Sequence, residues 1–167
     1  MGLLPPEQTA GGPADVAPEV TMRQVTPHLL WIGHSGDRAQ PRNLHAAGIG
    51  AIVDVAIDEA PASVSRELVY CRFPLTDGSA NHRWMLRTAV ECVASFLRSR
   101  TPVLVCCSGG MSRSPCIAAA ALSLVTGETA EQTLRTVLAG GPCDLSGGLW
   151  EVVQASIAQG RQARDEG

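Results

Sequence analysis

The sequence predicts a single α/β domain in which a central, mostly parallel sheet of about four to five strands is flanked by helices. The chain has 167 residues, enough for one domain with a sizeable core and too few for two comfortable ones. Hydrophobic residues make up 45% of it and charged residues 17%, as is typical of a globular protein. Short apolar runs alternate with helical patterns, which favours parallel strands joined through helices.

The predicted strands are short apolar runs that end at turn residues. They lie at 22–25, 29–32, 51–55, 68–73 and 103–106. The turn residues Thr26-Pro27-His28 separate the first two strands. Pro74 follows the fourth run, so we expect that strand to end there.

The predicted helices carry periodic apolar residues or glycine stop signals. They lie at 42–47, 81–98, 114–124, 129–138 and 147–159. Gly48 and Gly127 follow the first and the third helix. Apolar residues at helical spacing within 81–98 indicate one buried face. The segment after Arg113 is apolar on all sides, as expected for a central helix, and Pro115 suits a first turn.

Composition divides the chain into three segments. We expect a flexible tail at 1–20, because this stretch holds four prolines and three glycines and no basic residue. One folded domain should occupy 21–160, and a solvated C-terminal end 161–167. No apolar run is long enough to span a membrane.

The charge pattern gives no sign of a nucleic-acid or membrane partner. The net charge is -3, and all 13 basic residues are arginine. The chain therefore lacks the polybasic lysine clusters that are typical of proteins that bind nucleic acids or membranes. We expect a cytoplasmic monomer.

Six cysteines occur, an even number that would suit disulfides in a secreted protein. Nothing marks the chain as secreted, and the cysteines show neither a Cys-x-x-Cys pair nor a zinc-type Cys/His spacing. Reduced thiols are therefore the expected state, without a metal or other cofactor.

One cysteine stands in a context that indicates chemistry. Cys107 and Arg113 are separated by five residues, but Cys92 and Arg98 share this spacing inside a helical pattern, so spacing alone decides nothing. What distinguishes Cys107 is a buried strand before it, a loop with two glycines, and a helix that begins at the arginine. Such a loop can turn backbone N–H groups inward to form an anion nest, and the helix N-terminus adds positive potential. An arginine fork can hold two phosphate oxygens, and the same field favours a thiolate.

The run Cys107-Ser-Gly-Gly-Met-Ser-Arg113-Ser114 resembles the phosphate loop of cysteine-dependent protein phosphatases, in particular the dual-specificity branch. Upstream, Leu30-Trp-Ile-Gly, the run Ala47 to Val55, and Phe73-Pro-Leu-Thr-Asp77 resemble that family's opening segments in the same order. The resemblance covers roughly residues 22–158. It implies a protein-tyrosine-phosphatase-like fold and a dual-specificity-phosphatase-like catalytic domain over 21–160.

The resemblance also implies a role for each residue of the loop. Cys107 would attack phosphorus and form a phosphocysteine, Arg113 would bind the equatorial oxygens, and Ser114 would assist the departing thiolate. The phosphate-binding residues would be Ser108, Gly109, Gly110, Met111, Ser112 and Arg113. The substrate would be a phosphoprotein carrying phosphotyrosine, with phosphoserine and phosphothreonine as further candidates.

The leaving group needs a proton, so a general acid is required. Asp77 lies in a polar loop thirty residues before Cys107 and matches the family's acid. Asp54, Asp58 and Glu59 are rivals outside the family's acid loop. For Asp77, the alternative is an ordinary turn residue before a glycine.

The residue before the nucleophile departs from the family, in which a histidine is usual and supports the loop. Here it is Cys106. A thiol supports a loop only weakly, so we expect lower activity at acidic pH. Cys106 is either a small apolar residue at the end of a buried strand or a resolving thiol for oxidised Cys107, a role that Cys71, Cys116 or Cys143 could also fill.

Two other functional classes remain as alternatives to a phosphatase. A phosphate-binding pseudophosphatase or adaptor would keep the loop and Arg113 without turnover, and the missing histidine favours it. A thiol redox protein of the arsenate-reductase type is suggested by the neighbouring cysteines Cys106 and Cys107.

Overall fold

The computed structural model describes residues 21–165, with side chains described through residue 158. The predicted tail at 1–20 lies outside the described residues. The last helix, α5 (Gly147–Asp165), extends into the segment that we expected to be a solvated end.

A five-stranded sheet forms the centre of the domain, in the order β1-β2-β5-β3-β4. Its strands are β1 (Arg23–Gln24), β2 (Leu30–His34), β3 (Ala51–Ala56), β4 (Val69–Leu75) and β5 (Val103–Cys107). Only β1 runs antiparallel to its neighbour, and the pairs β2–β5, β5–β3 and β3–β4 are parallel. The predicted α/β fold with a mostly parallel sheet is confirmed.

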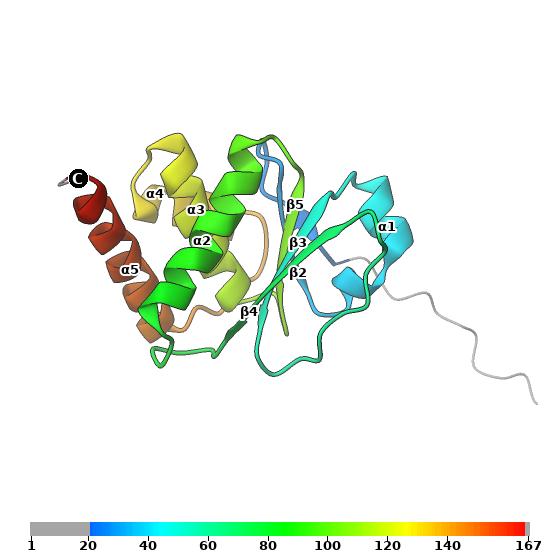
Figure 1. The fold of residues 1–167 in the computed structure, drawn as a ribbon, viewed down its shortest axis with the longest axis horizontal. Coiled ribbons are helices and arrows are strands. Elements are labelled where there is room, and N and C mark those ends of the chain that lie inside the picture. Colours follow the sequence, from blue (N-terminus) through cyan, green and yellow to red (C-terminus); the bar gives the residue numbers. More distant parts are fainter. Residues whose placement is uncertain (1–20, 166–167) are drawn as a thin grey trace, which may run out of the picture.

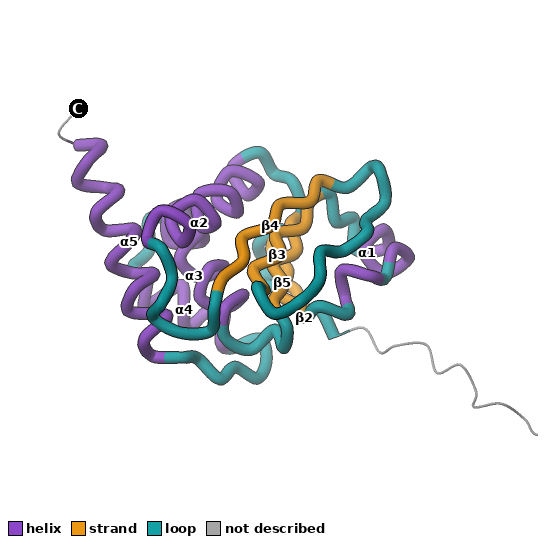
Figure 2. The backbone as a smooth tube through the Cα atoms, turned by 60° about the horizontal axis from the view of Figure 1, so that its bottom comes forward, coloured by secondary structure: helices purple, strands orange, loops and turns teal. Residues whose placement is uncertain are grey.

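Helices cover both faces of this sheet. They are η1 (Asp37–Ala39), α1 (Pro41–Ala46), α2 (Arg83–Arg98), α3 (Arg113–Thr126), α4 (Ala130–Leu138) and α5. Helices α2 to α5 lie together on one side of the strands and α1 lies on the other (Figure 1, Figure 2). Helix α3 is buried along almost its whole length, as predicted from its apolar sequence.

The sheet separates two apolar clusters. The larger cluster joins one face of the sheet to α2, α3 and α5, and it includes Cys107. The smaller one, on the side of α1, includes Leu44, Ile52 and Cys106. Because successive residues of a strand point to opposite faces, Cys106 and Cys107 belong to different clusters.

Strand β4 differs from the prediction because it continues through Pro74 to Leu75. The strand order places β4 at the edge of the sheet. A proline that lacks an N–H is tolerated in an edge strand, where the missing donor would otherwise face solvent.

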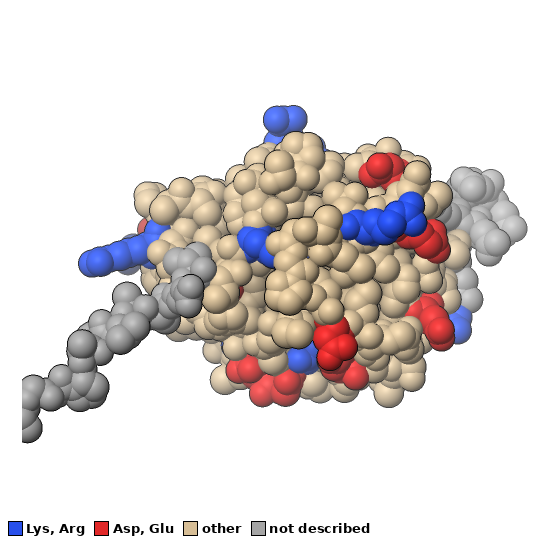
Figure 3. Space-filling view, turned by 180° about the vertical axis from the view of Figure 1, so that it is seen from behind, with Lys and Arg blue, Asp and Glu red and all other residues tan. Residues whose placement is uncertain are grey.

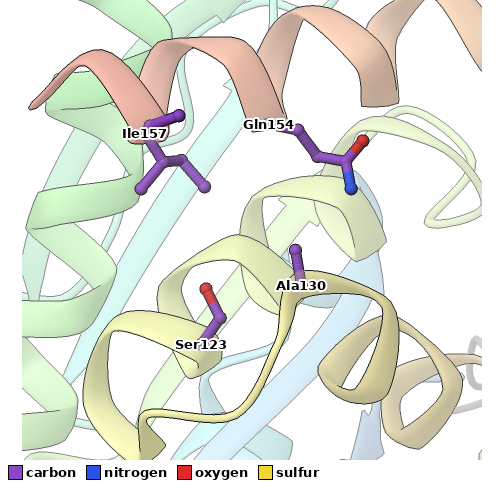
Figure 4. Close-up of a pocket in the computed structure, with 5 residues that line it drawn as sticks. Ser123, Ala130, Gln154 and Ile157 are labelled. Atoms are coloured by element: carbon purple, nitrogen blue, oxygen red, sulfur yellow. The ribbon is translucent and has the colours of Figure 1, made fainter. Parts of the chain in front are cut away.

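The surface shows charges of both signs. Figure 3 shows basic and acidic side chains scattered over one face, with neutral surface between them. A pocket of about 140 Å³ lies between α3, α4 and α5, lined by Ser123, Ala130, Gln154, Ile157 and Ala158 (Figure 4). Within residues 21–165, no helix has the length and apolar character needed to cross a membrane.

The end of α2 provides a test of the fold. Arg100 has a φ of 58°, and the turn closes through bonds from Arg100 N to Leu97 O and from Thr101 N to Phe96 O. Glycine is the usual residue at this left-handed position. Arg100→Gly removes about 1–2 kcal/mol of strain and adds about 0.5–1 kcal/mol of backbone entropy cost. We expect the free energy of unfolding in urea to rise by about 0.5–1 kcal/mol.

The control for this prediction is Arg87→Gly, which places glycine on the exposed surface in the middle of α2. That change should lower the free energy of unfolding by about 1 kcal/mol. Destabilisation by Arg100→Gly would show that the arginine at this turn makes a stabilising contact.

Candidate active site

The segment 107–113 connects the central strand β5 to the buried helix α3. Strand β5 lies between β2 and β3, so this connection emerges in the middle of the carboxyl edge of the parallel strands. In open α/β sheets this edge is the usual place for ligands. The predicted order of strand, glycine-containing loop and helix is therefore present at the expected place.

The sulfur of Cys107 is approached by two polar groups, one from its own loop and one from the start of α3. The Gly110 N–H donates a hydrogen bond to the sulfur at 3.2 Å, and the hydroxyl of Ser114 lies 3.3 Å from it. Cys107 is only 2% exposed. Donors directed at a sulfur stabilise negative charge on it, so this arrangement suits a thiolate and its later departure as a leaving group.

Gly110 is required by the geometry of the loop on two grounds. Its φ is 70°, in the left-handed region that side chains disfavour. A Cβ at this position would also lie 2.8 Å from the backbone oxygen of Gly33. A Cβ at Gly109, by contrast, would meet no atom within 4 Å, so only one of the two predicted glycines is sterically needed.

The back of the loop is held by the turn that follows β2. The N–H and the hydroxyl of Ser35 both donate to the carbonyl of Ser108, each at 3.4 Å. On the other side, the Asp144 N–H donates to the Met111 carbonyl at 2.9 Å. The side chain of Met111 is exposed, at the rim of the loop.

Arg113 points toward the loop and is almost fully buried. Its Nη1 donates to the Leu75 carbonyl at 2.9 Å, and its Nη2 donates to the Ser108 hydroxyl at 2.9 Å. Both Nη atoms also bond the carboxylate of Asp58. The Nε atom has no hydrogen-bond partner among the described residues. Both Nη atoms of Arg113 thus have hydrogen-bond partners, whereas its Nε atom, a buried donor, has none within residues 21–158.

Asp58 is the site residue whose role sequence reasoning missed, because it was considered only as a rival acid. It accepts hydrogen bonds from Arg113 and, at 2.6 Å, from the Ser108 hydroxyl. These bonds hold the pKa of Asp58 far below its usual range. A carboxylate that stays ionised cannot donate a proton, but it can orient the guanidinium.

Asp77 lies on the loop between β4 and α2 and reaches the phosphate loop. Its carboxylate accepts a hydrogen bond from the Ser112 hydroxyl at 2.6 Å. Asn81 shapes this loop, because its amide donates to the carbonyls of Thr76 and Gly78, each at 2.9 Å. Asp77, the predicted acid, is exposed and lies next to the phosphate loop. From this position its carboxyl group can reach the leaving group of a substrate bound in the loop.

Asp54 and Cys106 lie on the other face of the sheet. Asp54 is fully buried, pairs with Arg38 and accepts a hydrogen bond from the Tyr70 hydroxyl at 2.6 Å, so it is poorly placed to protonate a substrate. Burial, assisted by the charge of Asp54, raises the pKa of the Cys106 thiol. Cys106 thus has the surroundings of a neutral core thiol.

The other candidate partners of Cys107 are also thiols, because all six cysteines are free. Burial raises the pKa of Cys116 to about 12, which keeps that thiol neutral. Among the side chains that the structure describes, those of residues 21–158, no group of three or more His, Cys, Asp or Glu could hold a metal ion.

Comparison with known proteins gives one family match. The family model described as "Polymorphic toxin system, DSP-PTPase phosphatase" matches residues 34–128. This range includes the turn after β2, the loop 107–113 and all of α3. No curated protein matches the chain in sequence.

Solved structures share the fold. A mouse putative dual specificity phosphatase, crystallised with zinc tungstate, is 25% identical with a TM-score of 0.77, covering 93% of this chain and 97% of its own. Human DUSP28 is 23% identical with a TM-score of 0.74, covering 86% and 99%. The human tyrosine phosphatase-like serine/threonine/tyrosine-interacting protein is 19% identical with a TM-score of 0.69, covering 82% and 95%.

Proposed function

Because the chain belongs to the DSP-PTPase phosphatases of polymorphic toxin systems and is a cysteine-based phosphatase, we propose that it hydrolyses phosphotyrosine in proteins through a phosphocysteine intermediate. Phosphoserine and phosphothreonine are candidate further substrates. The observation that carries this proposal is the convergence of an amide, a hydroxyl and an arginine around the loop of Cys107.

In the first step, the Cys107 thiolate attacks phosphorus and the phosphorus–oxygen bond to the substrate breaks. The proton for the leaving oxygen comes from Asp77. Arg113 and the loop amides, which form part of the anion nest, stabilise the charge on the equatorial oxygens.

In the second step, water attacks the phosphocysteine and transfers a proton to the Asp77 carboxylate. The sulfur–phosphorus bond breaks, and inorganic phosphate and the thiolate are released. The hydroxyl of Ser114, 3.3 Å from the sulfur, stabilises the thiolate as it departs.

Steady-state hydrolysis of p-nitrophenyl phosphate and of a phosphotyrosine peptide tests the proposal, with tungstate binding measured on the same protein. Tungstate is a suitable probe because the mouse relative is a complex with zinc tungstate. Turnover of both substrates supports the proposal. Tungstate binding without turnover would favour the phosphate-binding adaptor.

Asp77→Asn tests the acid. We expect the rate on phenyl phosphate, whose leaving group is poor, to fall by about 10²–10⁴-fold, because a general acid contributes about this much. The rate on p-nitrophenyl phosphate should fall much less, because p-nitrophenolate leaves without protonation. The ratio of the two rates, measured at one pH, gives the result.

The control for Asp77→Asn is Glu59→Gln, which makes the same isosteric change at another candidate acid. It should leave the ratio of the two rates unchanged. If Glu59→Gln lowers the phenyl phosphate rate selectively and Asp77→Asn does not, the acid is misassigned.

A further inference from the structure

We propose that Arg38 and Arg72, paired with the buried Asp54, are positioning residues that clamp the segment carrying Asp58 and thereby set the orientation of Arg113. The inference rests on the proposed function, because it assigns a role to groups behind the same phosphate loop. These charged residues take no part in the chemistry described above.

The burial of this cluster calls for an explanation. Asp54 is fully buried in β3, whose other five residues are apolar, and Arg38 is 6% exposed. Removing charged groups from water costs several kcal/mol for each ion, and well-packed apolar residues often serve the core equally well. The strand could therefore pack without a charge at this position.

Asp54 is the anion to which the cluster is anchored. Its carboxylate pairs with Arg38 Nη1, accepts from the Tyr70 hydroxyl at 2.6 Å and from the Ala56 N–H at 3.1 Å, and lies 3.9 Å from Arg72 Nη1. The carboxylate thus bonds the Arg38 guanidinium directly and attracts the Arg72 guanidinium, whose Nη1 makes no hydrogen bond to any described residue. The two arginines come from different parts of the chain. Arg38 belongs to the turn after β2 and Arg72 to the edge strand β4.

Each arginine uses its Nη2 atom on the backbone beside Asp58. Arg38 Nη2 donates to the Ala60 carbonyl at 2.7 Å. Arg72 Nη2 donates to the carbonyls of Glu59, at 2.7 Å, and Ala56, at 3.1 Å. These three carbonyls lie on both sides of Asp58 in the sequence, so the clamp holds the short segment that presents its carboxylate.

The Ile57 N–H donates to the Leu75 carbonyl at 3.2 Å and anchors the chain just before Asp58. The clamp matters because it also holds the chain after Asp58. The side chain of Asp58 is 54% exposed, and this residue follows the end of β3 in a segment without regular structure. Because the clamp already holds the backbone in place, Asp58 loses less conformational entropy when it pairs with Arg113. A misplacement of about 1 Å in such a supporting group can cost about 10²-fold in rate.

Arg72→Met is the cleaner test variant, because Arg38 also donates to the Ser35 carbonyl, at 3.2 Å, and so contacts the turn that supports the loop. Arg72 is partly exposed, and methionine keeps much of its apolar stem. The double variant Arg38→Met/Asp54→Leu replaces the ion pair with apolar residues and is the second test. Arg135→Met, at an exposed position on α4, is the control.

The experiment is a double-mutant cycle between Arg72→Met and Asp58→Asn, with tungstate affinity by calorimetry and kcat/KM on p-nitrophenyl phosphate as readouts. Thermal unfolding of each variant shows that it is folded. Arg72→Met is expected to weaken tungstate binding and to lower kcat/KM by about 10- to 100-fold. In the Asp58→Asn background the same change should alter both by less than about twofold, because the clamp acts through Asp58.

Equal effects of Arg72→Met in the two backgrounds would overturn the inference, as would a folded Arg72→Met or Arg38→Met/Asp54→Leu variant with wild-type affinity. Tungstate affinity is measured without turnover. A wild type that binds tungstate but hydrolyses neither substrate therefore contradicts the proposed function. In that case the double-mutant cycle, measured by tungstate affinity, still tests the role of Arg72.

Discussion

Cys107→Ser is expected to reduce hydrolysis of p-nitrophenyl phosphate by about 10⁴-fold or more, to a level near background. A serine hydroxyl at this position keeps the size of the side chain but is a far poorer nucleophile and leaving group than a thiolate. The loop amides and Arg113 remain, so tungstate binding should persist in the variant. Initial rates and calorimetry on the same preparation provide both measurements.

The chain supplies a matched control in Cys92→Ser. Cys92 precedes Arg98 by the same spacing, but it lies within α2. Burial and the neighbouring Cys71 raise the pKa of its thiol to about 12, so that it stays neutral. This variant should keep wild-type activity. Appreciable turnover by folded Cys107→Ser would contradict the assigned nucleophile.

Arg113→Lys is expected to lower kcat by about 10³-fold or more, because an arginine that stabilises transition-state charge contributes about 10³–10⁵ in phosphoryl transfer. Lysine keeps the charge but cannot bond Leu75, Ser108 and Asp58 together while leaving a further donor for phosphate. Tungstate affinity should fall as well. Steady-state kinetics and calorimetry measure the two losses.

Arg98→Lys is the matched control, because this arginine lies on the surface at the end of α2, where its Nη2 bonds the Leu124 carbonyl. Its activity should equal that of the wild type. Retention of kcat by Arg113→Lys would mean that a point charge suffices and that the several donors of the planar guanidinium have no catalytic role.

The loop was predictable because its parts are neighbours in the sequence. An apolar run, two glycines, an arginine and a proline at a helix start together indicate a strand, a tight connection and a buried helix, and the structure has all three. The opposite faces of Cys106 and Cys107 follow from strand alternation as well. At the end of β5, this alternation places the Cys106 side chain on the opposite face of the sheet from that of Cys107.

Asp58 and its clamp could not be predicted in the same way. Asp58 meets Arg113 across 55 positions in the sequence, and Arg38 meets Asp54 across 16. No local pattern encodes such contacts, because they depend on the strand order that places β3 beside β5. The extension of β4 through Pro74 likewise depends on its edge position.

The central claim is that Cys107 carries the phosphoryl group during turnover. Rapid acid quenching of the enzyme during hydrolysis of a phosphotyrosine peptide, followed by peptide mass mapping, tests it directly. The account predicts one added phosphoryl group on the peptide that contains Cys107 and none in Cys107→Ser. A phosphoryl group on another residue, or turnover with no phosphoenzyme under conditions that trap it in a known cysteine-dependent phosphatase, would contradict the claim.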